Sequence, residues 1–213
     1  MHTAKLVLSA AAIAALAGCG SSKPSAQVPP SSSAAAGSAP VSSSSSSSTP
    51  AGVLAPDATS AATGDIPDNQ VFLVYTNTAA GYSLEYPEGW TQSGSGADVT
   101  FRDKNNLVHV IIAHAARPTT ASVGAALVAL RRSNPTLTFH APQAVVLGAA
   151  HAIKAVYRTR SAPNPVTGRR VTLIVDRYEL GRAGRVAVVD LGTPTGVDNV
   201  DAYRKMIASF RWR

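Results

Sequence analysis

The sequence predicts an α+β domain in which helices pack on an antiparallel sheet. Beyond about residue 65, patterns of two-residue and helical periodicity follow one another in the order strands, helix, strands, helix. The joins between successive strands are short and rich in Gly, Pro and Asn, which favours antiparallel neighbours. The roughly 145 residues of this part suit a single hydrophobic core.

Residues 1–18 have the pattern of a signal peptide. Lys5 precedes an apolar run, Leu6 to Ala15, that is shorter than the roughly 20 residues a membrane-spanning helix needs. Leu16-Ala17-Gly18-Cys19 resembles the lipobox of bacterial lipoproteins, which implies lipidation of Cys19, the only cysteine. We therefore expect a protein that is lipid-anchored on the extracytoplasmic face of a cell membrane. An ordinary secretory signal that leaves a free thiol is the alternative.

Residues 19–65 are expected to form a flexible tether that begins at the lipidated cysteine. This segment consists mainly of Ser, Ala, Pro, Gly and Thr, and it includes an unbroken serine run from Ser42 to Ser48. Such a composition buries too little apolar surface to offset the entropy of ordering the chain. A chain of this kind has an r.m.s. reach of about 35–40 Å. The globular domain is then expected at residues 66–213.

The domain opens with strand patterns. Val71–Tyr75 is a short apolar segment, and Tyr82–Tyr86 alternates apolar with polar side chains. Ala97–Arg102 and Leu107–His114 flank a polar turn and predict a hairpin. Four further strands are expected later in the chain, at residues 143–147, 151–161, 170–180 and 185–191.

Two segments carry helical periodicity. Ala121–Ser133 places apolar side chains on one face, has two arginines in its last turn and ends before Pro135. Asn199–Phe210 repeats apolar side chains at helical spacing, with Asp198 as the candidate N-cap. Both helices are therefore expected to lie against the sheet.

Two motifs resemble a known family. The segment from Gly81 to Trp90, GYSLEYPEGW, resembles the opening of PsbP-like domains, and Tyr203 to Phe210, YRKMIASF, resembles their closing helix. The resemblance covers residues 71–213 and implies an α-β-α sandwich with a central antiparallel sheet flanked by helices. Known members of this family are mostly binding or assembly modules. We interpret the motif residues as structural: Gly81, Tyr82, Tyr86, Pro87, Gly89, Trp90 and Phe210.

No catalytic, metal or cofactor site is expected from the sequence. His109 and His114 have an odd separation on one strand and would face opposite sides of the sheet, so they would not chelate a metal together. His140 and His151 would meet only by tertiary approach. A nucleophile elbow, a phosphate loop and a Rossmann fingerprint are absent from the sequence. An enzyme is thus the least favoured class.

Charge points to an anionic partner. The chain has 19 Lys and Arg against 12 Asp and Glu, a net charge of +7, and all basic residues except Lys5 and Lys23 lie in the predicted domain. We define the basic patch as Lys154, Arg158, Arg160, Arg169 and Arg170. The first three share a strand face, and the last two begin the next strand, near Arg160. Lipid headgroups, cell-wall polymers or an acidic protein would suit this patch, and a simply solvated face is the alternative.

We therefore expect a lipid-anchored extracytoplasmic binding or assembly module, without catalytic activity, that engages a protein or envelope partner. A carrier of a lipid or small apolar ligand, held between sheet and helix, is one alternative. A photosystem II-associated extrinsic protein of the PsbP type is another that the family resemblance implies. Nucleic acid is disfavoured, because the protein is predicted to be exported and its basic residues lack interleaved exposed aromatics.

Overall fold

Strands dominate the part of the chain that the computed structural model describes, residues 64–164 and 168–213. They form a three-stranded and an eight-stranded sheet, and every pairing is antiparallel. The predicted signal peptide, Cys19 and nearly all of the predicted tether lie outside the described residues. None of the described helices is long and apolar enough to cross a membrane.

The smaller sheet has the order β1-β2-β11. It joins the start of the domain to its end, because β2 pairs on one side with β1 and on the other with β11. The strands are β1 (Phe72–Asn77), β2 (Tyr82–Pro87) and β11 (Arg211–Trp212).

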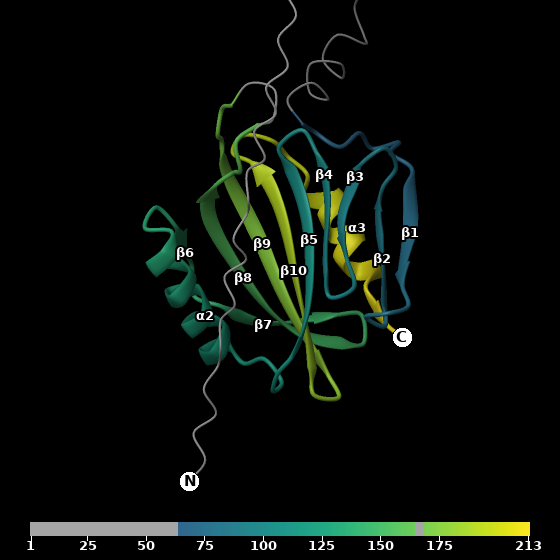
Figure 1. The fold of residues 1–213 in the computed structure, drawn as a ribbon, viewed down its shortest axis with the longest axis vertical. Helices are drawn as coiled ribbons and strands as arrows, with labels where there is room; N and C mark the ends of the chain where they lie inside the picture. The colour runs from purple at the N-terminus through teal and green to yellow at the C-terminus, as the bar shows by residue number, and fades with distance from the viewer. Residues whose placement is uncertain (1–63, 165–167) are drawn as a thin grey trace, which may run out of the picture. The chain divides into compact units, whose positions relative to one another are not determined.

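The larger sheet has the order β3-β4-β5-β10-β9-β8-β6, and β7 also pairs with β8. Its strands are β3 (Thr91–Ser95), β4 (Asp98–Asp103), β5 (Asn106–His114), β6 (Thr138–Phe139), β7 (Gln143–Leu147), β8 (Ala150–Arg160), β9 (Thr172–Arg182) and β10 (Arg185–Pro194). Its centre consists of the long strands β8, β9 and β10, which follow one another in the chain, and of β5, which pairs with β10 (Figure 1).

The two helices pack on opposite faces of the larger sheet. Helix α2 (Thr120–Ser133) shares a core cluster with Ile153, Ala155 and Tyr157 of β8. Helix α3 (Val200–Ser209) belongs to a second cluster, which includes Ala152 of the same strand. Since successive side chains of a strand point to opposite faces, the two clusters lie on the two sides of β8. In Figure 1, α2 lies beside β8, whereas α3 lies behind β3 and β4, on the side toward β2.

The predicted α+β domain on an antiparallel sheet is thereby confirmed. The more detailed expectation of a complete α-β-α sandwich stays a prediction, because the core cluster that α2 joins takes its strand residues from β6, β8 and β9. One cap differs from expectation: α3 has Asn199, not Asp198, as its N-cap residue. Asp198 instead accepts a hydrogen bond from the Val200 N–H at 3.2 Å.

Candidate functional site

The family-like motif residues sit at the junction of the two sheets. Tyr82 is fully buried and stacks on Phe210 with ring centroids 5.7 Å apart. Tyr86 stacks on Phe101 of β4 at 4.3 Å, so an aromatic contact joins the smaller sheet to the larger one. Burial raises the pKa of the Tyr82 hydroxyl to about 12. These contacts place the aromatic residues of the motif in the core.

The turn after β2 explains the remaining motif residues. Gly89 has a φ of 86°, in the left-handed region that favours glycine, and it precedes the buried Trp90. Gly81 also has positive φ, 66°, and a side chain there would crowd the Arg185 guanidinium and the Arg213 carbonyl. Pro87 is buried at the end of β2. These residues therefore shape the backbone at the two ends of β2.

The basic patch occupies one end of the β8–β9 hairpin. Lys154, Arg158 and Arg160 share a face of β8 because they are spaced by two or four residues. Arg170 donates to the Ser161 carbonyl at 2.8 Å, which holds it beside the end of β8. Arg158, Arg160, Arg169 and Arg170 are all exposed. The predicted neighbourhood of these residues is therefore present in the structure.

One member of the patch is already neutralised. The Lys154 ammonium lies 2.7 Å from the Asp176 carboxylate and 5.3 Å from the centre of the Tyr178 ring. Burial alone would lower the pKa of Lys154, but the hydrogen bond and charge of Asp176 outweigh it and raise that pKa above its ordinary value. The outward-directed charge of the patch therefore comes from its arginines.

A cavity of about 360 Å³ adjoins the patch on β8. Val156 and Ile174 contribute apolar surface to its lining, and Arg158 and His140 contribute polar groups. The guanidinium of Arg131 lies 5.4 Å from the ring centre of Phe139, another lining residue. This hollow therefore combines charged and apolar lining groups next to the patch.

Sequence reasoning missed a buried ion pair on the opposite face. Arg177 of β9 and Asp190 of β10 are register neighbours, and two guanidinium nitrogens donate to the two carboxylate oxygens at 2.8 and 2.7 Å. The Tyr157 hydroxyl donates to the same carboxylate at 3.1 Å. Charged residues inside otherwise apolar strands were the available signal, but their pairing depends on the strand register.

Two further ionisable groups flank this pair. Glu179 is buried, and loss of solvent raises its pKa, although the nearby Arg177 charge acts in the opposite direction. His109 stands opposite Asp190 in the register of β5 and β10, and its Nε2 lies 2.8 Å from Asp98 Oδ1. The result is a row of ionisable side chains that crosses adjacent strands. We interpret the Arg177–Asp190 pair as the interaction of this row that contributes most to the stability of the sheet, and we call it the structural centre of the row.

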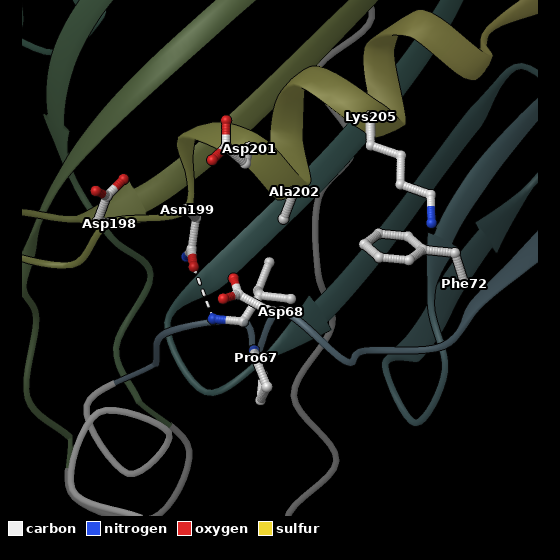
Figure 2. A pocket seen from close by; sticks show the side chains of 9 residues that line it. Pro67, Asp68, Phe72, Asp198, Asn199, Asp201, Ala202 and Lys205 are labelled. Carbon is white, nitrogen blue, oxygen red and sulfur yellow. Dashed lines mark hydrogen bonds between the residues drawn. The ribbon is translucent and has the colours of Figure 1, made fainter. Parts of the chain in front are cut away.

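A second cavity, of about 270 Å³, lies where the chain enters the domain beside α3 (Figure 2). Asp68, Asp198 and Asp201 line it together with Lys205, whose ammonium lies 4.1 Å from the ring centre of Phe72. Figure 2 shows these side chains around the hollow, with the Asn199 side chain turned toward the lead-in segment. The lining is mixed, because the apolar side chains of Ile66, Pro67, Phe72 and Ala202 border the same cavity as these charged groups.

Asn199 has the N-cap position of α3, but its side chain holds the lead-in segment in place and makes no capping bond. Its Oδ1 accepts from the Ile66 N–H at 2.8 Å, the bond drawn in Figure 2, and its Nδ2 donates to Thr193 and to Asn106. Asn106 in turn donates to the Gly64 carbonyl at 2.5 Å. Because Asn199 is buried and engaged in this network, its side chain makes no capping bond to α3.

No group of three or more His, Cys, Asp and Glu side chains is placed to hold a metal ion within residues 64–164 and 168–213. His109 and His114 lie five residues apart on β5, which directs them to opposite faces. His140 borders the cavity beside the patch, whereas His151 borders a different cavity with Arg117.

Comparisons with known proteins agree with the fold. The family model described as PsbP matches residues 70–129. The solution structure of cyanobacterial PsbP (CyanoP) from Synechocystis sp. PCC 6803 is similar at 18% identity and a TM-score of 0.52, over 70% of this chain and 98% of that one. No curated protein matches the chain. At this identity, the structural likeness concerns the fold alone.

Two other solved structures are more distant. A Bacteroides thetaiotaomicron protein has 12% identity and a TM-score of 0.42, over 66% of this chain and 48% of that one. The Saccharomyces cerevisiae Ran-binding protein Mog1p has 8% identity and a TM-score of 0.46, over 68% and 96%.

Proposed function

We propose that this chain, which carries a PsbP-like domain, is a non-catalytic binding or assembly module that engages an anionic partner of the cell envelope. In this proposal the domain is held to the extracytoplasmic face of a membrane by a lipid on Cys19. The tether at residues 19–65 separates it from that surface. The basic patch is the surface that meets the partner.

The charge of the β8–β9 hairpin is the observation that carries the proposal. From His151 to Val175 the sequence contains five basic residues and no Asp or Glu. The nearest carboxylate in register, Asp176, is engaged by Lys154. The exposed Arg158 and Arg160 form no ion pair with any residue in the described part of the chain. Two exposed positive charges of this kind attract anionic surfaces over about 8 Å at physiological salt.

Reversing two charges tests the patch. The test uses the full chain carrying Arg158→Glu and Arg160→Glu, and it measures the amount of partner that is crosslinked and co-purified from native envelopes. We expect this salt-sensitive capture to fall by about tenfold or more, because each basic residue near an anionic surface contributes roughly 1 kcal/mol. Arg117→Glu with Arg182→Glu is the matched control, since it makes the same change in net charge at exposed positions. Arg182 lies at the far end of β9, about 30 Å along the strand from the register positions of Arg158 and Arg160. If the patch variant and the control variant captured equal amounts of the partner, the patch would not be the binding surface.

The lipid anchor has its own test. Cys19→Ala is expected to release the protein from membranes into the soluble fraction, because the thiol that accepts the lipid is absent. Fractionation of cells followed by immunodetection measures the change. If the Cys19→Ala protein stayed with the membranes after washing at high salt, the lipid anchor would be contradicted. If high salt alone released the parent protein, its attachment would depend on charge and not on a lipid.

The carrier alternative finds no specific support in the cavities described above. The cavity beside α3 is bordered by Asp68, Asp198, Asp201 and Lys205, and the cavity beside the patch includes Arg158 and His140. Both are open to charged groups. The sequence and fold also give no observation specific to a photosystem partner, so that alternative stays a prediction from family resemblance.

A further inference from the structure

We propose that two copies of this chain associate through their β1 strands, which pair antiparallel across a two-fold axis at Val74. This inference is independent of the basic patch. It starts from the position of β1, which ends the smaller sheet and, among the strands of residues 64–164 and 168–213, pairs only with β2. In Figure 1, β1 lies at the margin of the fold, and no other described strand lies on its outer side.

The register identifies the free backbone groups of β1. The Glu88 N–H donates to the Val71 carbonyl at 2.9 Å, and the same register pairs Leu73 with Tyr86 and Tyr75 with Leu84. Hydrogen-bonded pairs alternate in an antiparallel ladder, so they fall on the odd-numbered residues of β1.

The even-numbered residues, Phe72, Val74 and Thr76, therefore direct their N–H and C=O groups away from β2. Pro87 agrees with this assignment: it stands opposite Phe72, where the ladder requires no N–H. A strand added on the outer side of β1 would meet three residues whose outward backbone groups pair with no described strand.

The side chains around this edge are apolar and exposed. Val71 is 55% exposed, Leu73 39% and Val74 64%, and β1 contains no charged residue, proline or glycine. Natural proteins protect edge strands with charges, proline or short length. The ends of the larger sheet show such protection, because β3 is polar and contains a glycine and β6 has only two residues. The edge of β1 lacks it.

A second copy fits this edge by symmetry. With the axis at Val74, the free groups of Val74 meet those of the other Val74, and Phe72 meets Thr76 in both directions. Leu73 then stands opposite Tyr75 of the other copy, and aromatic–aliphatic cross-strand pairs of this kind are favourable. Symmetry therefore satisfies all three free positions of each strand at once.

The charges near the axis permit this pairing. Glu85 is the register neighbour of Val74 in β2. The two copies of Glu85 would stand three strand spacings apart, about 14 Å, which exceeds the screening length of about 8 Å at physiological salt. A single six-residue strand pair is a small interface, so we expect a dimer that forms with rising concentration and gains from confinement to a membrane surface.

Cysteine crosslinking tests this arrangement in the full chain with Cys19→Ala, which leaves one thiol. Val74→Cys places two thiols on residues whose Cα atoms would be about 5.5 Å apart, within disulfide range. Mild oxidation is expected to yield a concentration-dependent dimer at a rate about tenfold or more above that of Val146→Cys, because pairing raises the effective thiol concentration. Val146 is the matched control, since it is 63% exposed and lies on β7.

A second variant tests association without crosslinking, because a disulfide can also form when two copies collide at random. Val74→Lys is expected to lower the association constant in sedimentation equilibrium by about tenfold or more, through like charges at the axis and lost apolar burial. Val146→Lys is expected to leave it unchanged. Equal crosslinking at positions 74 and 146 would overturn the proposal. So would a Val74→Cys thiol in the monomer that resists maleimide, because another segment would then cover β1.

Discussion

Asp190→Ala is expected to lower the free energy of unfolding by about 3–5 kcal/mol. The substitution leaves the Arg177 guanidinium without its two carboxylate acceptors and removes the acceptor of the Tyr157 hydroxyl. The two side chains of the pair are 13% and 6% exposed, so water replaces little of what is lost. Urea unfolding of the full chain measures the change.

The control is the other carboxylate–cation pair of β9. Asp176→Ala breaks the ion pair with Lys154, but both side chains are about 30% exposed, and we expect a cost of at most about 1 kcal/mol. The double variant Arg177→Met, Asp190→Leu should recover most of the lost stability, because it removes both buried charges and keeps side-chain volume. An Asp190→Ala protein within about 1 kcal/mol of the parent would show that the pair is not a structural centre.

Phe101→Ala is expected to cost about 3–5 kcal/mol of stability, as large-to-small substitutions of buried aromatics do. Phe101 is fully buried in β4, and its ring meets Tyr86 at 4.3 Å and Tyr75 at 5.2 Å. Both partners belong to the smaller sheet, so the cavity would open where the two sheets meet. Thermal and urea unfolding of the full chain measure the loss.

Two variants make the effect specific. Phe101→Leu should cost less than Phe101→Ala because it leaves a smaller cavity. Val146→Ala, at an exposed position, should stay within about 0.5 kcal/mol of the parent. A coupling energy of about 0.5–1.5 kcal/mol between Phe101 and Tyr86 is expected from a double-mutant cycle. Coupling near zero would contradict the aromatic contact as the link between the sheets.

Local patterns predicted most of the elements. Residues 143–147 were expected as a strand and form β7, and the expected helix over Ala121–Ser133 begins one residue earlier as α2. Alternation and helical spacing act within a few residues, so they are visible in the sequence. The two-residue strands β6 and β11 carry no such pattern, because they form only through pairing with β8 and β2.

Features that depend on strand pairing could not be predicted from local sequence patterns. The basic patch could be placed because Arg158 and Arg160 share one strand and Arg170 begins its hairpin partner. The Arg177–Asp190 pair required the register of β9 against β10. Asp198 was wrongly expected as the N-cap of α3, because the helix begins one residue later and Asn199 takes the N-cap position. The contacts that hold Asn199 there come from residues far away in sequence, among them Ile66 and Asn106.

The free edge of β1 also needed the full sheet order. Val71–Tyr75 was predicted as a short strand, but periodicity does not show which strands have a neighbour on each side. Only the order β1-β2-β11 leaves Val74 at an edge. The sequence therefore predicted the basic patch, whereas the proposed dimer surface came from the structure.

Site-specific photocrosslinking in native envelopes tests the binding function most directly. A photoreactive residue at position 158, in the basic patch, is compared with one at the exposed Arg182 at the far end of β9. We predict a recurring adduct with one anionic envelope component at position 158, diminished by high salt, and none at position 182. Equal adducts at both positions, or none at position 158, would contradict a binding module that acts through this patch.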